Sequence, residues 1–261
     1  MVNFTIDHKQ ISVPEGTTIM EAAAQNGIPI PKLCYLKDVN EIAACRVCVV
    51  EVKGIHHLVT SCNNQVQEGM EILTNSPRVR EARKINVELL LSQHHTNCPT
   101  CIRSGNCTLQ KIANDLNLVT DRYKTEYAPV NWTQTFPLFK DAGKCIKCMR
   151  CVQICDKIQG LGIWDVEKTG SRTNVDVSYS REIKMSDCAL CGQCITHCPT
   201  AALQERDDVS RIFEMSGDLN NPDKITVVQI APAVRAAWGE EFGLSREYAT
   251  DKRLVAALRR M

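Results

Sequence analysis

Aromatic side chains, long apolar runs and excess charge are all scarce in this sequence of 261 residues. Phe, Trp and Tyr make up only 5% of it, so large buried rings can contribute little to its cohesion. The longest apolar runs, such as residues 225–231, fall far short of the roughly 18 residues that span a bilayer, and we expect no membrane segment. A net charge of +1 provides no field that would attract a nucleic acid, which argues against that class of partner.

Cysteine, in contrast, is abundant, with 15 residues. The chain opens without the basic and apolar segments of a secretion signal, so we expect a cytoplasmic, reducing location. An odd number of cysteines in tight C-x2-C pairs fits metal ligation better than disulfides. We therefore expect inorganic centres to supply much of the folding free energy, and their removal to unfold the protein.

Two runs of cysteines repeat the spacing C-x2-C-x2-C-x3-C, at residues 145–155 and 188–198, and Pro199 follows the second. This spacing is typical of bacterial ferredoxins with two [4Fe-4S] clusters, in which the fourth cysteine of each run binds the other cluster. The crossed pattern predicts one cluster on Cys145, Cys148, Cys151 and Cys198, and one on Cys155, Cys188, Cys191 and Cys194.

The first part of the chain predicts a small mixed sheet that carries one helix. Strands are predicted from apolar runs at residues 2–6, 10–13, 47–52 and 71–74. The helix is predicted to begin at the capping box of Thr18 and Glu21 and to end at Gly27. Four cysteines follow it, with 10, 2 and 13 residues between them, and can form one further site: Cys34, Cys45, Cys48 and Cys62.

A second helix, with Ser76 as its N-cap and Pro77 in its first turn, leads to another set of ligands. The pattern H-x3-C-x2-C-x5-C comprises His94, Cys98, Cys101 and Cys107. Three cysteines and one histidine suit a structural zinc ion as well as a [4Fe-4S] cluster, so spacing alone leaves both open. The neighbouring His95 is expected to be structural.

The number of ligands favours clusters throughout. Four clusters need sixteen protein ligands, and the 15 cysteines together with His94 supply them with none left over. The other histidines are expected to be solvent-exposed or to lie near the clusters without binding them: His8, His56, His57 and His197. A neutral imidazole in place of a thiolate makes a cluster less negative, so we expect a raised potential at the His94 site.

Two segments lack cluster ligands. Residues 119–140 have no clear period and predict a linker that packs on the next domain. Residues 156–187 separate the two cysteine runs, and apolar strands at 163–166 and 175–177 predict an inserted hairpin. We expect the role of this hairpin to be structural.

Residues 14–19, 31–35, 45–52 and 68–70 resemble the β-grasp [2Fe-2S] domain of [FeFe]-hydrogenases and of the large iron-sulfur subunit of complex I. The resemblance implies a [2Fe-2S] cluster on the cysteines of residues 34–62. It also implies a His-ligated [4Fe-4S] cluster on residues 94–107, although those families usually have proline where this chain has His95.

Residues 201–243 resemble the beginning of the [FeFe]-hydrogenase catalytic domain. That family anchors its H-cluster on further cysteines, and no cysteine follows Cys198 here. We therefore expect one [2Fe-2S] cluster, three [4Fe-4S] clusters and no H-cluster, and a chain that is not catalytic by itself.

The resemblance implies an α+β fold in four parts. They are a β-grasp [2Fe-2S] domain over residues 1–76, a small helical His-ligated [4Fe-4S] domain over 77–120, a two-[4Fe-4S] ferredoxin-like domain over 121–210 and a short α/β tail over 211–261. The apolar residues of the tail are expected to pack on the ferredoxin-like lobe or on a partner.

By resemblance, the chain is expected to be an electron-transfer subunit of an electron-bifurcating-type oxidoreductase complex. The partners implied are a flavin and NAD(P)-binding diaphorase subunit, a small [2Fe-2S] subunit, ferredoxin, and a formate dehydrogenase or hydrogenase catalytic subunit. The clusters of residues 34–62 and 94–107 would then be two entrances to the ferredoxin-like pair. The alternative is that the chain is the accessory-cluster region of a catalytic [FeFe]-hydrogenase.

Overall fold

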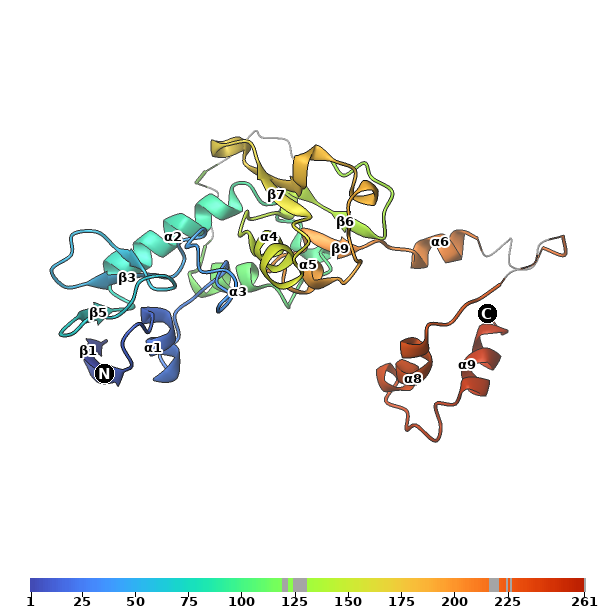
Figure 1. Cartoon of the computed structure of the whole chain (residues 1–261), viewed down its shortest axis with the longest axis horizontal. Coiled ribbons are helices and arrows are strands. Elements are labelled where there is room, and N and C mark those ends of the chain that lie inside the picture. Colours follow the sequence, from blue (N-terminus) through green and yellow to red (C-terminus); the bar gives the residue numbers. More distant parts are fainter. Residues whose placement is uncertain (119–121, 124–130, 216–220, 224, 226, 261) are drawn as a thin grey trace. The chain divides into compact units, whose positions relative to one another are not determined.

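The computed structural model describes residues 1–118, 122–123, 131–215, 221–223, 225 and 227–260. The chain divides into two compact units, Met1–Arg206 and Asp207–Met261, and each is described by itself. The first unit contains both helices and strands (Figure 1). Among the described residues, no helix is both long enough and apolar enough to cross a membrane.

A five-stranded mixed sheet forms the amino-terminal part of the first unit (Figure 1). Its strands are β1 (Val2–Ile6), β2 (Lys9–Val13), β3 (Val49–Val52), β4 (Val59–Thr60) and β5 (Glu71–Leu73), in the order β2-β1-β5-β3-β4. β1 and β5 run parallel, and the other neighbours run antiparallel. The predicted mixed sheet is confirmed, but β3 begins two residues later than expected because Val47 and Cys48 belong to a turn.

Local signals in the sequence account for the hairpin and the helix of this part. Asp7 and His8 form the β1–β2 turn in the left-handed region, with φ of 47° and 68°. The Asp7 carboxylate accepts a hydrogen bond of 2.7 Å from the Thr74 N–H, which ties the turn to the end of β5. Helix α1 (Ile19–Gln25) begins at the predicted capping box of Thr18 and Glu21 and packs its buried face on the sheet.

Helix α2 (Pro77–Leu91) leads from the sheet to the cysteine-rich part of the unit (Figure 1). The Ser76 hydroxyl accepts a hydrogen bond from the Val79 N–H and caps the helix as predicted. The short helix η1 (Cys98–Thr100) and helix α3 (Thr108–Asp115) follow. A core of buried side chains joins both long helices to the cysteine loops: Leu33, Val47, Val87, Leu109, Ile112 and Ile146.

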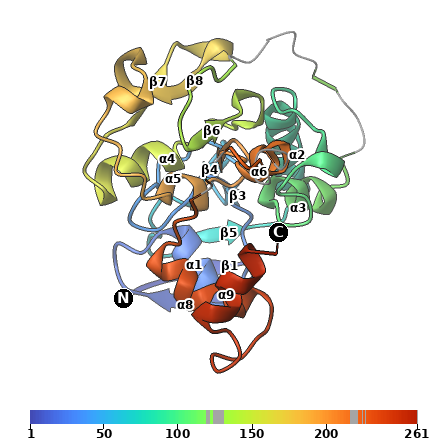
Figure 2. The ribbon, with the colours of Figure 1, turned by 90° about the vertical axis from the view of Figure 1, so that its right-hand side faces the viewer.

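The remainder of the first unit consists of short elements. They are β6 (Leu138–Lys140), η2 (Ala142–Lys144), α4 (Arg150–Gln153), η3 (Ile154–Ile158), β7 (Trp164–Glu167), η4 (Gly170–Arg172), β8 (Asn174–Val177), η5 (Ser178–Ser180), η6 (Ile183–Met185), α5 (Gln193–Thr196) and β9 (Leu203–Glu205). β7 and β8 form the predicted inserted hairpin. In Figure 2 this hairpin and helices α2 and α3 lie on opposite sides of β6.

Strand β6 was not predicted, because residues 119–140 show no strand period and were expected to be a linker. It forms by antiparallel pairing with the distant β9. Trp132 and Phe136 pack against the core of the cysteine-rich part, in line with the expected packing of this segment. The rest of the predicted linker, residues 119–121 and 124–130, lies outside the described residues.

The second unit contains three described helices: α6 (Val209–Glu214), α8 (Pro232–Glu241) and α9 (Asp251–Leu258). Its described residues include no strand, so the strand content expected for residues 211–261 is not found in them. Gly239 permits a close approach inside this unit, because a Cβ atom there would lie 2.3 Å from the Ala249 Cβ. The expected packing of the tail on the ferredoxin-like lobe stays a prediction.

Candidate iron-sulfur sites

Four buried thiols gather beside β3. They belong to Cys34, Cys45, Cys48 and Cys62, and each residue is at most 6% exposed. Hydrogen bonds between thiols lower the pKa of Cys45 to about 6 and that of Cys48 to about 7, while the partners Cys34 and Cys62 have raised pKa values. The thiolate is the form that binds metal, and the proximity of the four thiols in two hydrogen-bonded pairs brings their sulfurs together as candidate ligands.

The backbone around these thiols is suited to a negatively charged centre. The N–H groups of Val47 and Leu33 contribute to the lowered pKa of Cys45. Arg46, which lies between Cys45 and Cys48, has a left-handed backbone with φ of 50°. The buried Arg83 guanidinium donates to the Val49 carbonyl at 2.9 Å, next to Cys48, and places a cation close to the site. N–H groups and cations near thiolate sulfur stabilise a cluster.

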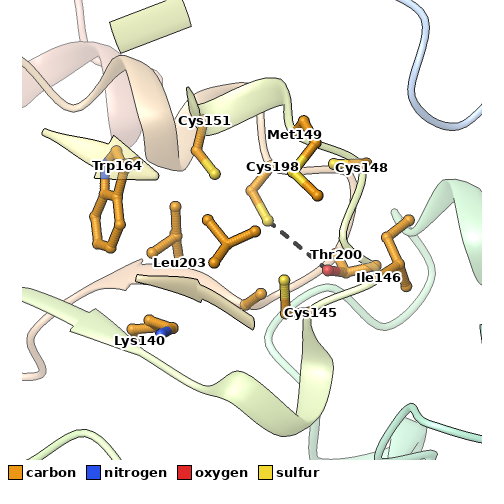
Figure 3. A pocket seen from close by; sticks show the side chains of 12 residues that line it. Lys140, Cys145, Ile146, Cys148, Met149, Cys151, Trp164, Cys198, Thr200 and Leu203 are labelled. Carbon is orange, nitrogen blue, oxygen red and sulfur yellow. Dashed lines mark hydrogen bonds between the residues drawn. The ribbon is translucent and has the colours of Figure 1, made fainter. Parts of the chain in front are cut away.

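Four more thiols surround one cavity, here termed the inner cavity (Figure 3). Its cysteines are Cys145, Cys148, Cys151 and Cys198, three from the first run and one from the end of the second. Burial raises the pKa of Cys148 to about 12 and that of Cys151 well above its usual value. The Cys148 and Cys151 thiols therefore stay protonated unless a cation replaces the proton, as happens on metal binding.

The remaining cysteines of the two runs line a second cavity, termed the outer cavity: Cys155, Cys188, Cys191 and Cys194. Cys191 is exposed, whereas Cys155 is buried. The Ile163 N–H donates to the Cys155 sulfur at 3.4 Å. Burial raises the pKa of Cys194 to about 11, and a hydrogen bond from the Trp164 side chain opposes this rise.

Both cysteine runs follow the same backbone path. The residues on either side of the second cysteine are left-handed in each run: Lys147 and Met149 have φ of 51° and 62°, and Leu190 and Gly192 have φ of 53° and 71°. Helices α4 and α5 begin directly after Met149 and Gly192. A left-handed conformation costs a residue other than glycine roughly 1–2 kcal/mol. Lys147, Met149 and Leu190 adopt this unfavourable conformation, which indicates that the fold accepts local backbone strain in order to bring the thiols together.

The inserted hairpin and β6 supply the walls of the cavities. Lys140, on β6, is 4% exposed and lines the inner cavity (Figure 3). Its Nζ atom lies 2.8 Å from Oδ2 of Asp176, on β8. Trp164, on β7, is 3% exposed and lines both cavities. The hairpin was expected to be only structural, and the sequence analysis did not identify Lys140 or Trp164 as cavity-lining residues. The scarcity of aromatic residues in the chain was the one signal that could have pointed to Trp164.

The fourth predicted set is less enclosed. His94, Cys98, Cys101 and Cys107 are half-buried. Burial lowers the pKa of His94, which favours the neutral imidazole that ligates metal. Its buried Nδ1 atom has no hydrogen-bond partner among the described residues. No hydrogen bond joins any two of these four side chains in the described part of the chain, so their convergence on one centre stays a prediction.

His95 contacts the segment before Cys145, and its expected structural role stays a prediction. Its N–H donates to the Gly143 carbonyl at 2.7 Å. A Cβ atom at Gly143 would lie 2.3 Å from the His95 ring, so only glycine permits this contact. The His94 ring lies against the backbone of Lys144, directly before Cys145. Segment 94–95 is thereby fixed beside the first cysteine of the inner cavity.

The donor sets suit iron-sulfur clusters. Four thiols surround the inner cavity and four others surround the outer cavity. Buried thiols with N–H neighbours are the ligand environment that iron-sulfur clusters require.

Four protein-family models match the chain. They are the 2Fe-2S iron-sulfur cluster binding domain over residues 1–77, the NADH-ubiquinone oxidoreductase-G iron-sulfur binding region over 83–122, the 4Fe-4S dicluster domain over 144–202, and the iron only hydrogenase large subunit, C-terminal domain, over 224–261. The expectation of a [2Fe-2S] domain and of [4Fe-4S] domains is confirmed. The total of four clusters stays a prediction.

Two curated relatives are subunits of NAD- or NADP-reducing hydrogenases. The chain is 40% identical to the NADP-reducing hydrogenase subunit HndD of Solidesulfovibrio fructosivorans over 100% of its own length and 45% of the relative. It is 34% identical to the NAD-reducing hydrogenase HoxS subunit gamma of Cupriavidus necator over 67% of its length and 75% of the relative. The chain thus spans less than half of the first relative and most of the second.

A solved structure extends the likeness to the fold. The chain resembles one chain in the crystal structure of an NAD+-reducing [NiFe]-hydrogenase in the H2-reduced state, with a TM-score of 0.72 and 26% identity. The match covers 79% of this chain and 88% of the other.

Proposed function

Because the chain belongs to the family of iron-sulfur subunits that includes the HoxS gamma subunit and the N-terminal iron-sulfur regions of [FeFe]-hydrogenase-like large subunits, we propose that it relays electrons within an NAD(P)-linked complex. One partner is a flavin and NAD(P)-binding diaphorase subunit, assisted by a small [2Fe-2S] subunit. The other is ferredoxin, or the catalytic subunit of a formate dehydrogenase or hydrogenase. The names of the relatives, which are NAD- and NADP-reducing hydrogenase subunits, support the first partner.

The observation that carries this proposal is the position of the inner cavity beside two other sites. Cys34 and Cys45 share one buried core with Cys148 of the inner cavity. The sulfur of Cys107 lies 3.8 Å from the Pro199 carbonyl, and Arg103 donates to the Cys198 carbonyl at 3.0 Å. The inner cavity is therefore the junction, with the sites of residues 34–62 and 94–107 as two entrances.

The outer cavity is the exit in this scheme. It shares the Trp164 wall with the inner cavity and contains Cys191, which is exposed. An exposed ligand brings a cluster within reach of a partner protein.

In this proposal, the residues of the chain bind the clusters, shield them from water and adjust their potentials, and they take no part in a chemical reaction. Iron-sulfur clusters, when bound, supply reversible one-electron chemistry. The thiolates hold them, the buried apolar cores keep water away, and N–H groups such as that of Ile163 stabilise the sulfur charge. No side chain is required to act as an acid or a base.

A pair of matched variants tests the branched relay. Cys48→Ala removes a ligand of one entrance and Cys101→Ala a ligand of the other, and neither alters the inner or the outer cavity. With the reconstituted full chain, we expect each variant to lose reduction by one donor, either the NAD(P)H-reduced diaphorase subunit or reduced ferredoxin, and to keep the other. Equal loss from both donors in both variants would contradict branching. Iron and sulfide analysis of the same samples decides between a cluster and zinc at residues 94–107.

A second candidate is the accessory region of a longer [FeFe]-hydrogenase polypeptide. The match of residues 224–261 to the C-terminal domain of iron only hydrogenases favours it. Sequencing the native reading frame beyond codon 261 distinguishes the two: further cysteine motifs support the hydrogenase, and a stop codon eliminates it.

A further inference from the structure

Two polar side chains cross from the site of residues 34–62 to the inner cavity. The first is Asn40, which is fully buried at 0% exposure. Its Nδ2 atom donates to the Cys34 carbonyl at 2.7 Å and to the Cys148 carbonyl at 2.9 Å. A single amide group thus joins a proposed ligand residue of one site to a proposed ligand residue of the other, and Asn40 itself lies 108 positions from Cys148 in the sequence.

The second side chain is Arg150, which is half-buried on α4. Its Nε atom donates to the Cys34 carbonyl at 3.2 Å, and one terminal nitrogen donates to the Tyr35 carbonyl at 3.0 Å. The other terminal nitrogen lies 3.5 Å from the carbonyl of His197, the neighbour of Cys198. Because the guanidinium is rigid and planar, these contacts fix the two loops at one relative position.

The burial of Asn40 is costly if its only purpose is packing. Both hydrogens of its amide nitrogen are used, but its Oδ1 atom is buried without a partner among the described residues. An unpaired buried acceptor destabilises the folded state, and a leucine of similar size would remove this acceptor but would also remove both donors to the Cys34 and Cys148 carbonyls. The amide is therefore explained by the two carbonyls that it holds.

We propose that Asn40 and Arg150 are positioning residues that form a polar clasp, which fixes the separation of the [2Fe-2S] site and the inner cavity and so sets the rate of electron exchange between them. This rests on the proposed function, since it needs a cluster in both sites. In the step, one electron leaves the reduced [2Fe-2S] centre, which is oxidised, and enters the [4Fe-4S] centre, which is reduced. No bond forms or breaks and no proton moves, so the rate depends on distance and on the potentials.

The experiment uses the reconstituted full chain with a pulse of photoreduced flavin as electron source. The variants are Asn40→Leu, which keeps the volume and loses both donors, and Arg150→Lys, which keeps the charge and loses the planar fork. The control is Lys157→Met, because Lys157 donates to the Val39 carbonyl at 2.8 Å on the same loop but contacts neither site. Two readouts are followed: the rate of electron redistribution between the clusters, and their spin–spin coupling when both are reduced.

We expect Asn40→Leu to slow the exchange severalfold and to weaken the spin–spin coupling, while the two midpoint potentials and the iron content stay as in the parent chain. Arg150→Lys should slow it less, and the control should not change it. An unchanged rate and coupling in Asn40→Leu with both clusters present would overturn the clasp, as would equal slowing in the control. If Asn40→Leu fails to assemble its clusters, the same readouts on Arg150→Lys decide the matter.

Failure of the clasp and failure of the relay are distinguishable. A parent chain that binds no [2Fe-2S] cluster, or that exchanges no electrons between its clusters, would overturn the proposed function and the clasp together. A parent chain that exchanges electrons at a rate that neither variant alters would overturn the clasp alone.

Discussion

The inner and outer cavities are built from the same cysteine spacing and the same left-handed turns, yet their surroundings differ. Cys148 and Cys198 of the inner cavity are buried, and a lysine lies in its wall. The outer cavity contains the exposed Cys191, next to Leu190, which is 58% exposed. The repeated motif therefore determines which residues are candidate ligands, whereas we expect the walls to determine the potential of each cluster and the access to it.

The largest expected effect tests whether the two cavities are crossed between the runs. Cys155 belongs to the first run but lines the outer cavity. Cys155→Ala should therefore abolish the electron paramagnetic resonance signal of the outer cluster and preserve that of the inner one. Spectra of the reduced, reconstituted chain measure this directly.

Two further variants serve as controls for the crossed arrangement. Cys188→Ala lies in the other run but in the same cavity, so it should reproduce the spectrum of Cys155→Ala. Cys151→Ala lies four residues from Cys155 but lines the inner cavity, so it should remove the other signal. Identical spectra for Cys151→Ala and Cys155→Ala would show that each run binds its own cluster.

The two cysteine runs could be recognised in the sequence because C-x2-C spacing is a local property, and the predicted sets line two separate cavities, while their assignment to clusters stays a prediction. The walls of these cavities could not be recognised in the same way. Lys140 meets Asp176, and Asn40 meets Cys148, only because separate segments fold together. Strand β6 was missed for the same reason, since its three residues become a strand by pairing with the distant β9. Asn40 also has no periodic or motif signal of its own.

The next effect concerns the charge beside the inner cavity. Lys140→Met keeps the length of the side chain and removes the cation, which favours the more negative, reduced cluster. We expect the potential of the inner cluster to fall by roughly 50 to 100 mV, from Coulomb interaction at an effective dielectric constant near 20. The outer cluster should change much less. Redox titration followed by electron paramagnetic resonance measures both.

The matched variant Asp176→Asn should act in the opposite direction. It removes the negative charge that lies 2.8 Å from the Lys140 cation, so the midpoint potential of the inner cluster should rise. A fall in potential in both variants would point to disturbed packing of the β7–β8 hairpin rather than to charge. Thermal unfolding of the two variants checks that packing independently.

The smallest expected effect is on the outer cavity. Trp164 lines both cavities, and its side chain donates a hydrogen bond to the outer thiol Cys194. Trp164→Phe keeps a ring in the shared wall and removes the N–H donor. One hydrogen bond is worth about 1 kcal/mol, so we expect the potential of the outer cluster to fall by roughly 20 to 40 mV. The inner cluster should keep its potential, because the wall remains closed. A change of potential confined to the inner cluster would mean that the indole acts on that cluster through packing. It would contradict the view that charge adjusts the potential of the inner cluster and a hydrogen bond that of the outer cluster.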